Sequence, residues 1–148
     1  MNKSIITAAT SAIIAVGAAT VPFLEVEDAT ELIDYQAKCT RAQAWFDLYI
    51  VESTKGKMRF TDGEAWRPKV TALQYAARGI GSATSLHIQR LARDKNLILN
   101  GRYTSDPNDY EMAGVIWETI GPKFGVQSAW GGRFGDANHF SCAWGGMK

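Results

Sequence analysis

The pattern of apolar and polar residues along the chain predicts three helices. Between residues 28 and 53, apolar residues recur at helical spacing, and a Lys-Gly-Lys sequence then ends the pattern. Pro68 suits the first position of a second helix, which Gly79 can close. Residues 106–120 repeat the helical pattern, and the Gly-Pro pair that follows stops it. These three segments supply the helical part of the expected fold.

Short apolar runs between the helices predict strands. Residues 58–61 lead into an Asp-Gly turn, and another apolar run ends at Asn100-Gly101, the strongest short signal for a hairpin. Residues 126–130 and 139–144 are strand candidates on either side of a glycine-rich turn. Because helices and strands are mixed and the hairpin is antiparallel, we expect a small single α+β domain. Its central antiparallel sheet would be flanked by helices.

The first residues of the chain differ from the rest. Residues 4–24 carry no charge, follow Lys3 and precede an acidic run. A helix of about 20 residues would span a bilayer, although the small and polar residues here weaken insertion. The pattern also resembles a secretory signal peptide, and the alternative is a buried element of the fold. We favour a signal or weak membrane anchor at residues 1–26, with membrane association through residues 4–24, and a folded domain at residues 27–148.

Length, charge and cysteine content limit the classes of protein to which this chain can belong. The chain has 148 residues, about one domain, and a net charge of +1. It has no basic stripe, so the composition gives no support to nucleic-acid binding through phosphate contacts. The two cysteines, Cys39 and Cys142, lie far apart in the sequence. We favour two buried thiols over a disulfide, which would require an oxidising compartment.

Two histidines and one aspartate form a candidate set of metal ligands. His87 and Asp94 are seven residues apart, and His139 follows about 45 residues after Asp94. A catalytic zinc site has three such protein ligands, imidazole nitrogen or carboxylate oxygen, and an open position for water. The alternative is ordinary, because a lone histidine is more often hydrogen-bonded or solvated than a ligand. The spacing alone does not decide between these interpretations.

Other side chains are candidates for a reaction centre near that set. Asp136 precedes His139 by three residues, and a carboxylate close to a metal-bound water can take its proton and later return it. An aspartate in a Gly-Asp turn also bonds to nearby backbone groups for purely local reasons. The Arg67 guanidinium can hold a carboxylate or steady an oxyanion, although its default role is a solvated charge. Trp66 and Trp130 can shape a cleft, although tryptophan more often packs in a core.

These segments together resemble the family of VanY-like D-alanyl-D-alanine carboxypeptidases and L-alanyl-D-glutamate endopeptidases, especially its phage-type members. The resemblance runs from about residue 60 to about residue 140. The family pattern has a Ser-x-His sequence, then Ala-x-Asp ending seven residues after the histidine, and later an acid shortly before a second histidine. An arginine that opens a helix lies upstream. The matching residues here are Arg67, Ser85, His87, Ala92, Asp94, Asp136 and His139.

The resemblance implies a zinc site and a mechanism. His87, Asp94 and His139 would bind Zn²⁺, which would activate a water for attack on an amide carbonyl. Asp136 would act as the general base and then as the general acid. The fold would be like that of the hedgehog and DD-peptidase domains.

The resemblance also implies contacts with the substrate, and this chain departs from the pattern at two places. Arg67 would bind or polarise the substrate carbonyl or carboxylate, and Ser85 would support the site; Trp130 completes the candidate substrate contacts. Arg90 stands three residues after the first histidine, where the family often has glycine, and Arg93 replaces a commonly small apolar residue. The glycine position puts the local backbone in question, because glycine adopts conformations that arginine resists.

The function expected from the resemblance is a zinc metallopeptidase that hydrolyses amide bonds in the stem peptides of peptidoglycan. The bond would be either L-Ala-D-Glu or D-Ala-D-Ala, and the enzyme would be a phage-type lysis enzyme. The alternatives are a non-catalytic zinc module that binds the cell wall and a host carboxypeptidase that maintains the wall. We expect action in the periplasm or cell wall after export or anchoring, or residence in the host cytoplasm until lysis. The oligomeric state is not indicated.

Overall fold

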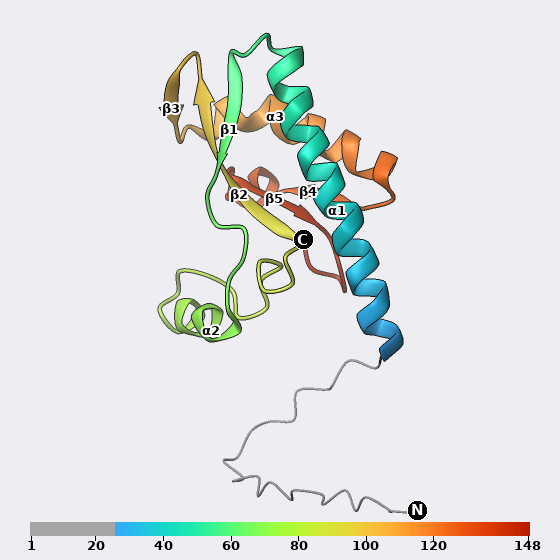
Figure 1. Ribbon diagram of the computed structural model, residues 1–148. Coiled ribbons are helices and arrows are strands. Elements are labelled where there is room, and N and C mark those ends of the chain that lie inside the picture. The colour runs from blue at the N-terminus through green and yellow to red at the C-terminus, as the bar shows by residue number, and fades with distance from the viewer. Residues whose placement is uncertain (1–25) are drawn as a thin grey trace, which may run out of the picture.

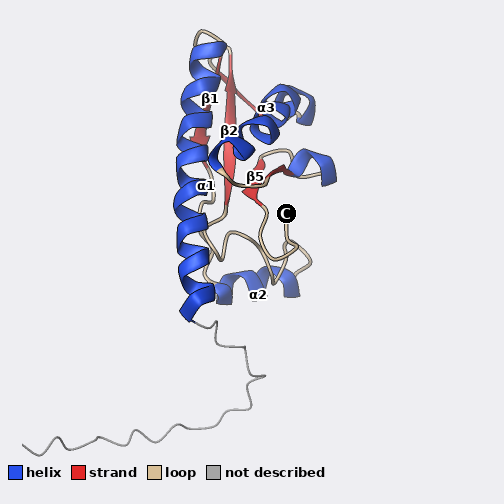
Figure 2. Ribbon diagram, turned by 90° about the vertical axis from the view of Figure 1, so that its right-hand side faces the viewer, coloured by secondary structure: helices blue, strands red, loops and turns tan. Residues whose placement is uncertain are grey.

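The computed structural model describes residues 26–148, with side chains from residue 29, and has the α+β class expected from the sequence. The helices are α1 (Val26–Ser53), α2 (Lys69–Ala77) and α3 (Pro107–Ile120), with the short 3₁₀ helices η1 (Gly121–Phe124) and η2 (Gly131–Phe134). The strands are β1 (Met58–Asp62), β2 (Ala92–Leu99), β3 (Arg102–Thr104), β4 (Ser128–Trp130) and β5 (His139–Cys142). Both views of the ribbon show α1 running along the sheet and α2 at the end of the molecule away from α3 (Figures 1 and 2).

The strands form one antiparallel sheet in the order β1-β2-β5-β4, and β3 pairs with β2. The hairpin predicted at Asn100-Gly101 is confirmed, since Leu99 is paired with Arg102 across it. The N-terminal part of β2 pairs with β5, and its C-terminal part pairs with β1 and β3. Strand β2 therefore connects the two halves of the sheet.

The main core lies between one face of the sheet and the helices α1 and α3. Phe46 on α1 packs against Phe140 on β5 and Trp117 on α3, with ring centroids 5.3 and 5.4 Å apart. Fully burying a side chain of this size stabilises the fold by about 1.5–3 kcal/mol. Because successive residues of a strand point to opposite faces, the residue before Phe140 points away from this core. That residue is His139.

A disulfide joins Cys39 on α1 to Cys142 on β5, so the favoured prediction of two free thiols is wrong. Cys142 lies on the same face of β5 as Phe140, where α1 covers the sheet, and both cysteines are buried. The two residues are 103 positions apart. Only the packing of the first described helix against β5 brings them together, which spacing in the sequence does not reveal.

The element boundaries differ from the predictions in two places. Helix α3 ends at Ile120 as expected, but Gly121-Pro122 does not stop the helical turn, which continues as η1. Proline at the start of a helical segment is tolerated because its missing N–H would be unbonded there. The C-terminal strands are also shorter than expected, and β4 begins at Ser128 because the backbone N–H of Gln127 donates to the Tyr35 hydroxyl.

The expected signal or anchor at residues 1–26 lies almost wholly outside the described residues. The described residues start at Val26, in α1, so the division of the chain near residue 27 stays a prediction. Among residues 26–148, no helix has the length and apolar character needed to cross a membrane.

Candidate metal centre

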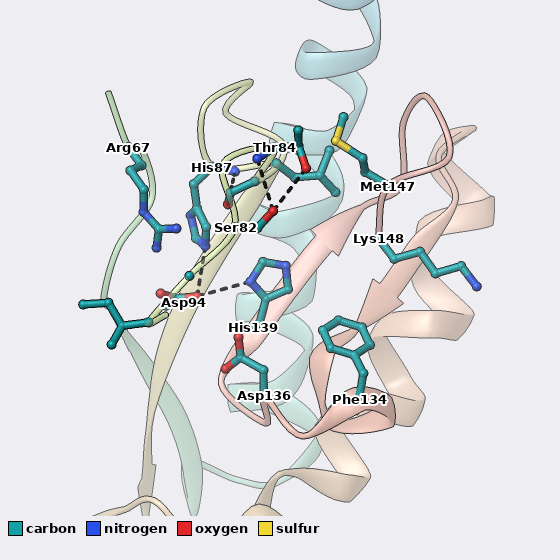
Figure 3. A pocket seen from close by; sticks show the side chains of 14 residues that line it. Arg67, Ser82, Thr84, His87, Asp94, Phe134, Asp136, His139, Met147 and Lys148 are labelled. Carbon is teal, nitrogen blue, oxygen red and sulfur yellow. Dashed lines mark hydrogen bonds and ion pairs between the residues drawn. The ribbon is translucent and has the colours of Figure 1, made fainter. Parts of the chain in front are cut away.

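Three side chains from separate segments converge on the face of the sheet opposite α1. His87 comes from the turn before β2, Asp94 from β2 and His139 from β5, and one ligand atom of each lies within 4.8 Å of the others. The Nε2 atom of His87 lies 3.2 Å from Oδ1 of Asp94, and Nδ1 of His139 lies 3.4 Å from the same oxygen. Figure 3 shows the three side chains pointing toward a common point in a cavity.

Sheet register sets the position of two of these side chains. Asp94 and His139 are directly opposite each other on β2 and β5. Side chains opposite each other in an antiparallel pair lie about 4.5–5.5 Å apart at Cβ and on the same face. The backbone N–H of Asp94 donates to the carbonyl of Glu64, and that of Gly63 donates to the carbonyl of Asp94, at 2.8 and 2.7 Å. A side chain at Gly63 would press on Asp94, since an added Cβ would lie 3.2 Å from the Asp94 Cβ.

A compact turn holds His87 against β2. The backbone N–H of Leu91 donates to the carbonyl of Leu86, and the N–H of His87 donates to the Ser85 hydroxyl at 3.3 Å. Arg90 closes this turn with φ of +56°, in the left-handed region that favours glycine. The turn that glycine would favour is therefore present here, and the left-handed conformation of Arg90 makes it energetically less favourable than it would be with glycine.

Burial and hydrogen bonding have opposite effects on the pKa of the Asp94 carboxyl. Burial acts to raise the pKa of its carboxyl, but the hydrogen bonds from His139 and His87 outweigh burial and hold the pKa well below its usual range. Asp94 is therefore an anion at neutral pH. Both imidazoles are buried, and Nδ1 of His87, the nitrogen not facing Asp94, has no hydrogen-bond partner among the described residues.

The donor set fits a divalent metal ion such as zinc. Bonds of about 2.0–2.2 Å in a tetrahedral site place neighbouring ligand atoms roughly 3.4 Å apart. The two contacts at Asp94 Oδ1, 3.2 and 3.4 Å, match this spacing. Two imidazoles and one carboxylate are also the ligand types that suit zinc. The types of ligand atom and these two separations therefore fit such an ion.

The three ligand candidates open into a cavity of about 350 Å³, which Arg67, Ser85 and Asp136 also line. The structure thus brings six of the seven predicted site residues into one cavity. Trp130 is placed elsewhere: it is 5% exposed, and its indole N–H donates to the Ala137 carbonyl at 2.7 Å. It packs in the core and borders a neighbouring cavity instead.

Arg67 is held by a partner that the sequence analysis did not single out. Its Nε donates to both carboxylate oxygens of Glu64 at 3.0 Å, and its Nη2 contacts the same carboxylate. These hydrogen bonds raise the pKa of the Arg67 guanidinium, so it stays charged. The guanidinium also lies over the Tyr75 ring, 5.0 Å from its centroid, and Arg67 lines the cavity. The three-residue separation of Glu64 and Arg67 is the sequence feature that could have indicated this ion pair.

Asp136 reaches the cavity because the glycine-rich turn folds tightly. Its backbone N–H donates to the carbonyl of Gly131, and the N–H of His139 donates to the carbonyl of Asp136, at 2.9 and 3.1 Å. At Gly131, an added Cβ would lie 2.2 Å from the Asp136 carbonyl oxygen and 2.7 Å from the His139 Cβ. Any larger residue would push these groups apart. Figure 3 shows the Asp136 carboxylate beside His139.

Comparison with known proteins gives a match in structure but none in sequence. No family model matches the chain, and no curated protein matches it. The crystal structure of the L-Ala D-Glu endopeptidase ChiX from Serratia marcescens matches with a TM-score of 0.62 and 18% sequence identity, over 78% of this chain and 85% of that one. At this identity the match shows a shared fold.

Proposed function

We propose that this protein is a zinc metallopeptidase that hydrolyses an amide bond in the stem peptides of peptidoglycan. The observation that carries the proposal is the convergence of His87, Asp94 and His139 in one cavity with a fourth polar group, Asp136, beside them. The fold that this chain shares with ChiX supports the same class of substrate. A bound zinc ion would supply Lewis acidity and lower the pKa of a coordinated water.

The residues of the chain have separate parts in this proposal. Asp136 would accept a proton from the attacking water and donate one to the departing amine. The Arg67 guanidinium would bind the substrate carbonyl or a carboxylate, while Glu64 holds the guanidinium in place. Ser85 supports the turn that carries His87 through its hydroxyl. Asp136 is what distinguishes an enzyme from a metal-bearing module that only binds.

The proposed bond is the L-Ala-D-Glu amide, because the protein of known structure that shares the fold is named as an endopeptidase for that bond. The test uses the purified full chain, loaded with zinc, on peptidoglycan and on two synthetic peptides that contain either an internal L-Ala-D-Glu bond or a C-terminal D-Ala-D-Ala. We expect new amino termini on D-Glu, identified by mass spectrometry of the fragments. Zinc-loaded protein that releases no fragment from either substrate would refute the proposal.

We further propose that the protein acts outside the cytoplasm, as a phage-type lysis enzyme. The disulfide between Cys39 and Cys142 supports this, because such bonds persist in the periplasm and outside the cell. The uncharged run at residues 4–24 would serve as the export signal or weak anchor. Fractionation of cells that express a tagged full chain tests this. A protein found wholly in the cytosolic fraction with both thiols reduced would contradict it.

A further inference from the structure

Two cavities meet beside the metal centre. The cavity that contains His139 and Asp136 shares Phe134 and Lys148 with a second cavity of about 300 Å³. No residue of the candidate metal set lines the second cavity. The two cavities are therefore neighbours at Phe134, and a substrate longer than the group held at the metal would pass this residue to enter the second one.

The second cavity follows the outer edge of the sheet. It is lined by the consecutive residues 127–130, which include all of β4. Side chains of a strand alternate between its two faces, so a cavity lying on one face would touch only every second residue. Contact with four residues in succession places the cavity along the strand edge, and β4 is an edge strand. Extended peptides bind to such edges through main-chain hydrogen bonds.

Phe134 stands where the two cavities join. Its side chain is 55% exposed, although it is a large apolar ring, and its centroid lies 6.2 Å from that of His139. Figure 3 shows the ring between His139 and Lys148, both of which border the cavity. An exposed ring this close to a candidate metal ligand offers a flat apolar surface to the residue next to the reacting bond.

Positively and negatively charged side chains border the second cavity. Arg133 donates to Glu118 from Nη2 at 2.8 Å and from Nε at 3.3 Å, and both residues line the cavity. Lys148 adds a further cation at the junction with the first cavity. A peptide that carries a carboxylate and an amine in successive residues can pair with these groups. An apolar peptide gains nothing from them.

We infer that the second cavity, along β4 and beyond Phe134, is a binding site for the continuation of the substrate peptide past the cleaved bond. Its occupant is an extended peptide with charged side groups, and Phe134 is a specificity-determining residue that contacts the peptide between the two cavities. The inference rests on the proposed function, because it takes the peptide to be the substrate. It predicts that the protein prefers peptides long enough to cross Phe134.

The test measures binding and cleavage with a two-residue peptide, L-Ala-D-Glu amide, and with a five-residue stem peptide that begins with the same residues. Metal-free protein is titrated with each peptide and followed by backbone amide NMR. We expect the long peptide to shift the amide signals of Gln127, Arg133 and Phe134, and the short peptide to leave them unchanged. Phe134→Ala should weaken binding of the long peptide by roughly threefold to tenfold, since an aromatic contact contributes about 0.5–1.5 kcal/mol.

The matched control is Tyr103→Ala, which removes an aromatic ring that is 62% exposed and lines neither cavity. This variant should bind both peptides as the parent does. In the zinc-loaded protein, Phe134→Ala should raise KM for the long peptide and leave kcat and metal content unchanged. Equal binding of the two peptides by the parent, or equal losses in both variants, overturns the inference. Failure of the zinc-loaded parent to cleave either peptide is a different outcome, which refutes the proposed function.

Discussion

Asp94 and His139 are cross-strand partners: the antiparallel register of β2 and β5 sets them directly opposite each other. Two of the three candidate ligands are therefore positioned by backbone pairing, and their separation does not depend on a flexible loop. A slip of one residue in this register would turn one of the two side chains to the other face of the sheet. The metal centre and the sheet therefore depend on the same pairing.

Replacing either histidine should remove the metal and lower the stability of the loaded protein. His87→Ala or His139→Ala leaves two ligand candidates, and binding of a metal that requires the folded site also stabilises the fold. Zinc content of the purified proteins and their thermal unfolding with and without zinc provide the measurement. Ser82→Ala is the control, since Ser82 lines the same cavity and bonds only to Thr84. Histidine variants that keep the parent's zinc content would contradict the ligand assignment.

Asp136→Asn should keep the zinc and lose hydrolysis. The amide is similar in size to the carboxylate but cannot accept the proton, so we expect kcat to fall by about 10²–10⁴-fold. The measurement pairs steady-state cleavage of an L-Ala-D-Glu peptide with metal analysis. Asp34→Asn, at an exposed position on α1, controls for the loss of one negative charge. Activity that survives in Asp136→Asn would show that another group is the base.

Removing the disulfide should destabilise the fold. The bond closes a segment in which the cysteines are 103 residues apart, and in the chain-entropy model a loop of about that length contributes on the order of 4–5 kcal/mol. We expect the Cys39→Ser, Cys142→Ser double variant to lose about 2–5 kcal/mol of unfolding free energy, measured by denaturant titration. Reductant should destabilise the parent to a similar extent and leave the double variant unchanged. A reductant effect on the double variant would assign the loss to something other than this bond.

Glycine at position 90 should be better tolerated than alanine. Arg90 has φ of +56°, and a left-handed residue other than glycine costs about 1–2 kcal/mol. Arg90→Gly and Arg90→Ala both remove the contact of the guanidinium with the Trp66 ring, 5.4 Å from its centroid, so comparing them isolates the backbone. We expect the glycine variant to be more stable by about 1 kcal/mol. At Arg78, where φ is −93°, the order of the same two variants should reverse.

Breaking the buried ion pair of Lys95 from the acidic side should cost more than removing the lysine. The Lys95 side chain is fully buried, and its Nζ lies 2.7 Å from Oδ1 of Asp47 on α1, whose side chain is 37% exposed, and 3.8 Å from Oδ1 of Asp62. Asp47→Ala leaves the buried cation with the more distant Asp62 carboxylate, so we expect it to lose more unfolding free energy than Lys95→Met, which replaces the cation with an apolar chain. Denaturant titration of both variants gives the comparison. Equal losses would show that the pair contributes through its charge alone.

Local sequence patterns predicted the helices and the hairpin, because these depend on short-range properties. The helix pattern at residues 28–53 and the Asn100-Gly101 hairpin follow from apolar spacing and turn chemistry within a few residues. The candidate ligands came from the scarcity of histidine and from the resemblance to a family pattern. Their convergence required a contact between strands about 45 residues apart, which local patterns do not encode.

The features that sequence reasoning missed all depend on packing between distant segments. The disulfide forms because α1 lies against β5, so it could not be predicted from sequence spacing. Trp130 is buried because the glycine-rich turn and α3 approach its ring closely. An added Cβ at Gly114 would lie 2.1 Å from the Trp130 ring, which shows how tightly that ring is enclosed. Phe134 was missed because nothing in the sequence distinguishes an aromatic residue at the junction of two cavities from one in the core.

The pairing of β2 also has a consequence for the order of folding. The β2–β3 hairpin closes over a two-residue turn, whereas pairing of β2 with β5 must first close a loop of about 45 residues. Contacts between distant segments form later because closing the long loop between them has an unfavourable entropy. Asp94 lies in the part of β2 that pairs with β5 and outside the ladder of the β2–β3 hairpin, so its pairing with His139 forms only when the long loop closes. If the proposed metal site is correct, its two strand ligands come together only after the hairpin has formed.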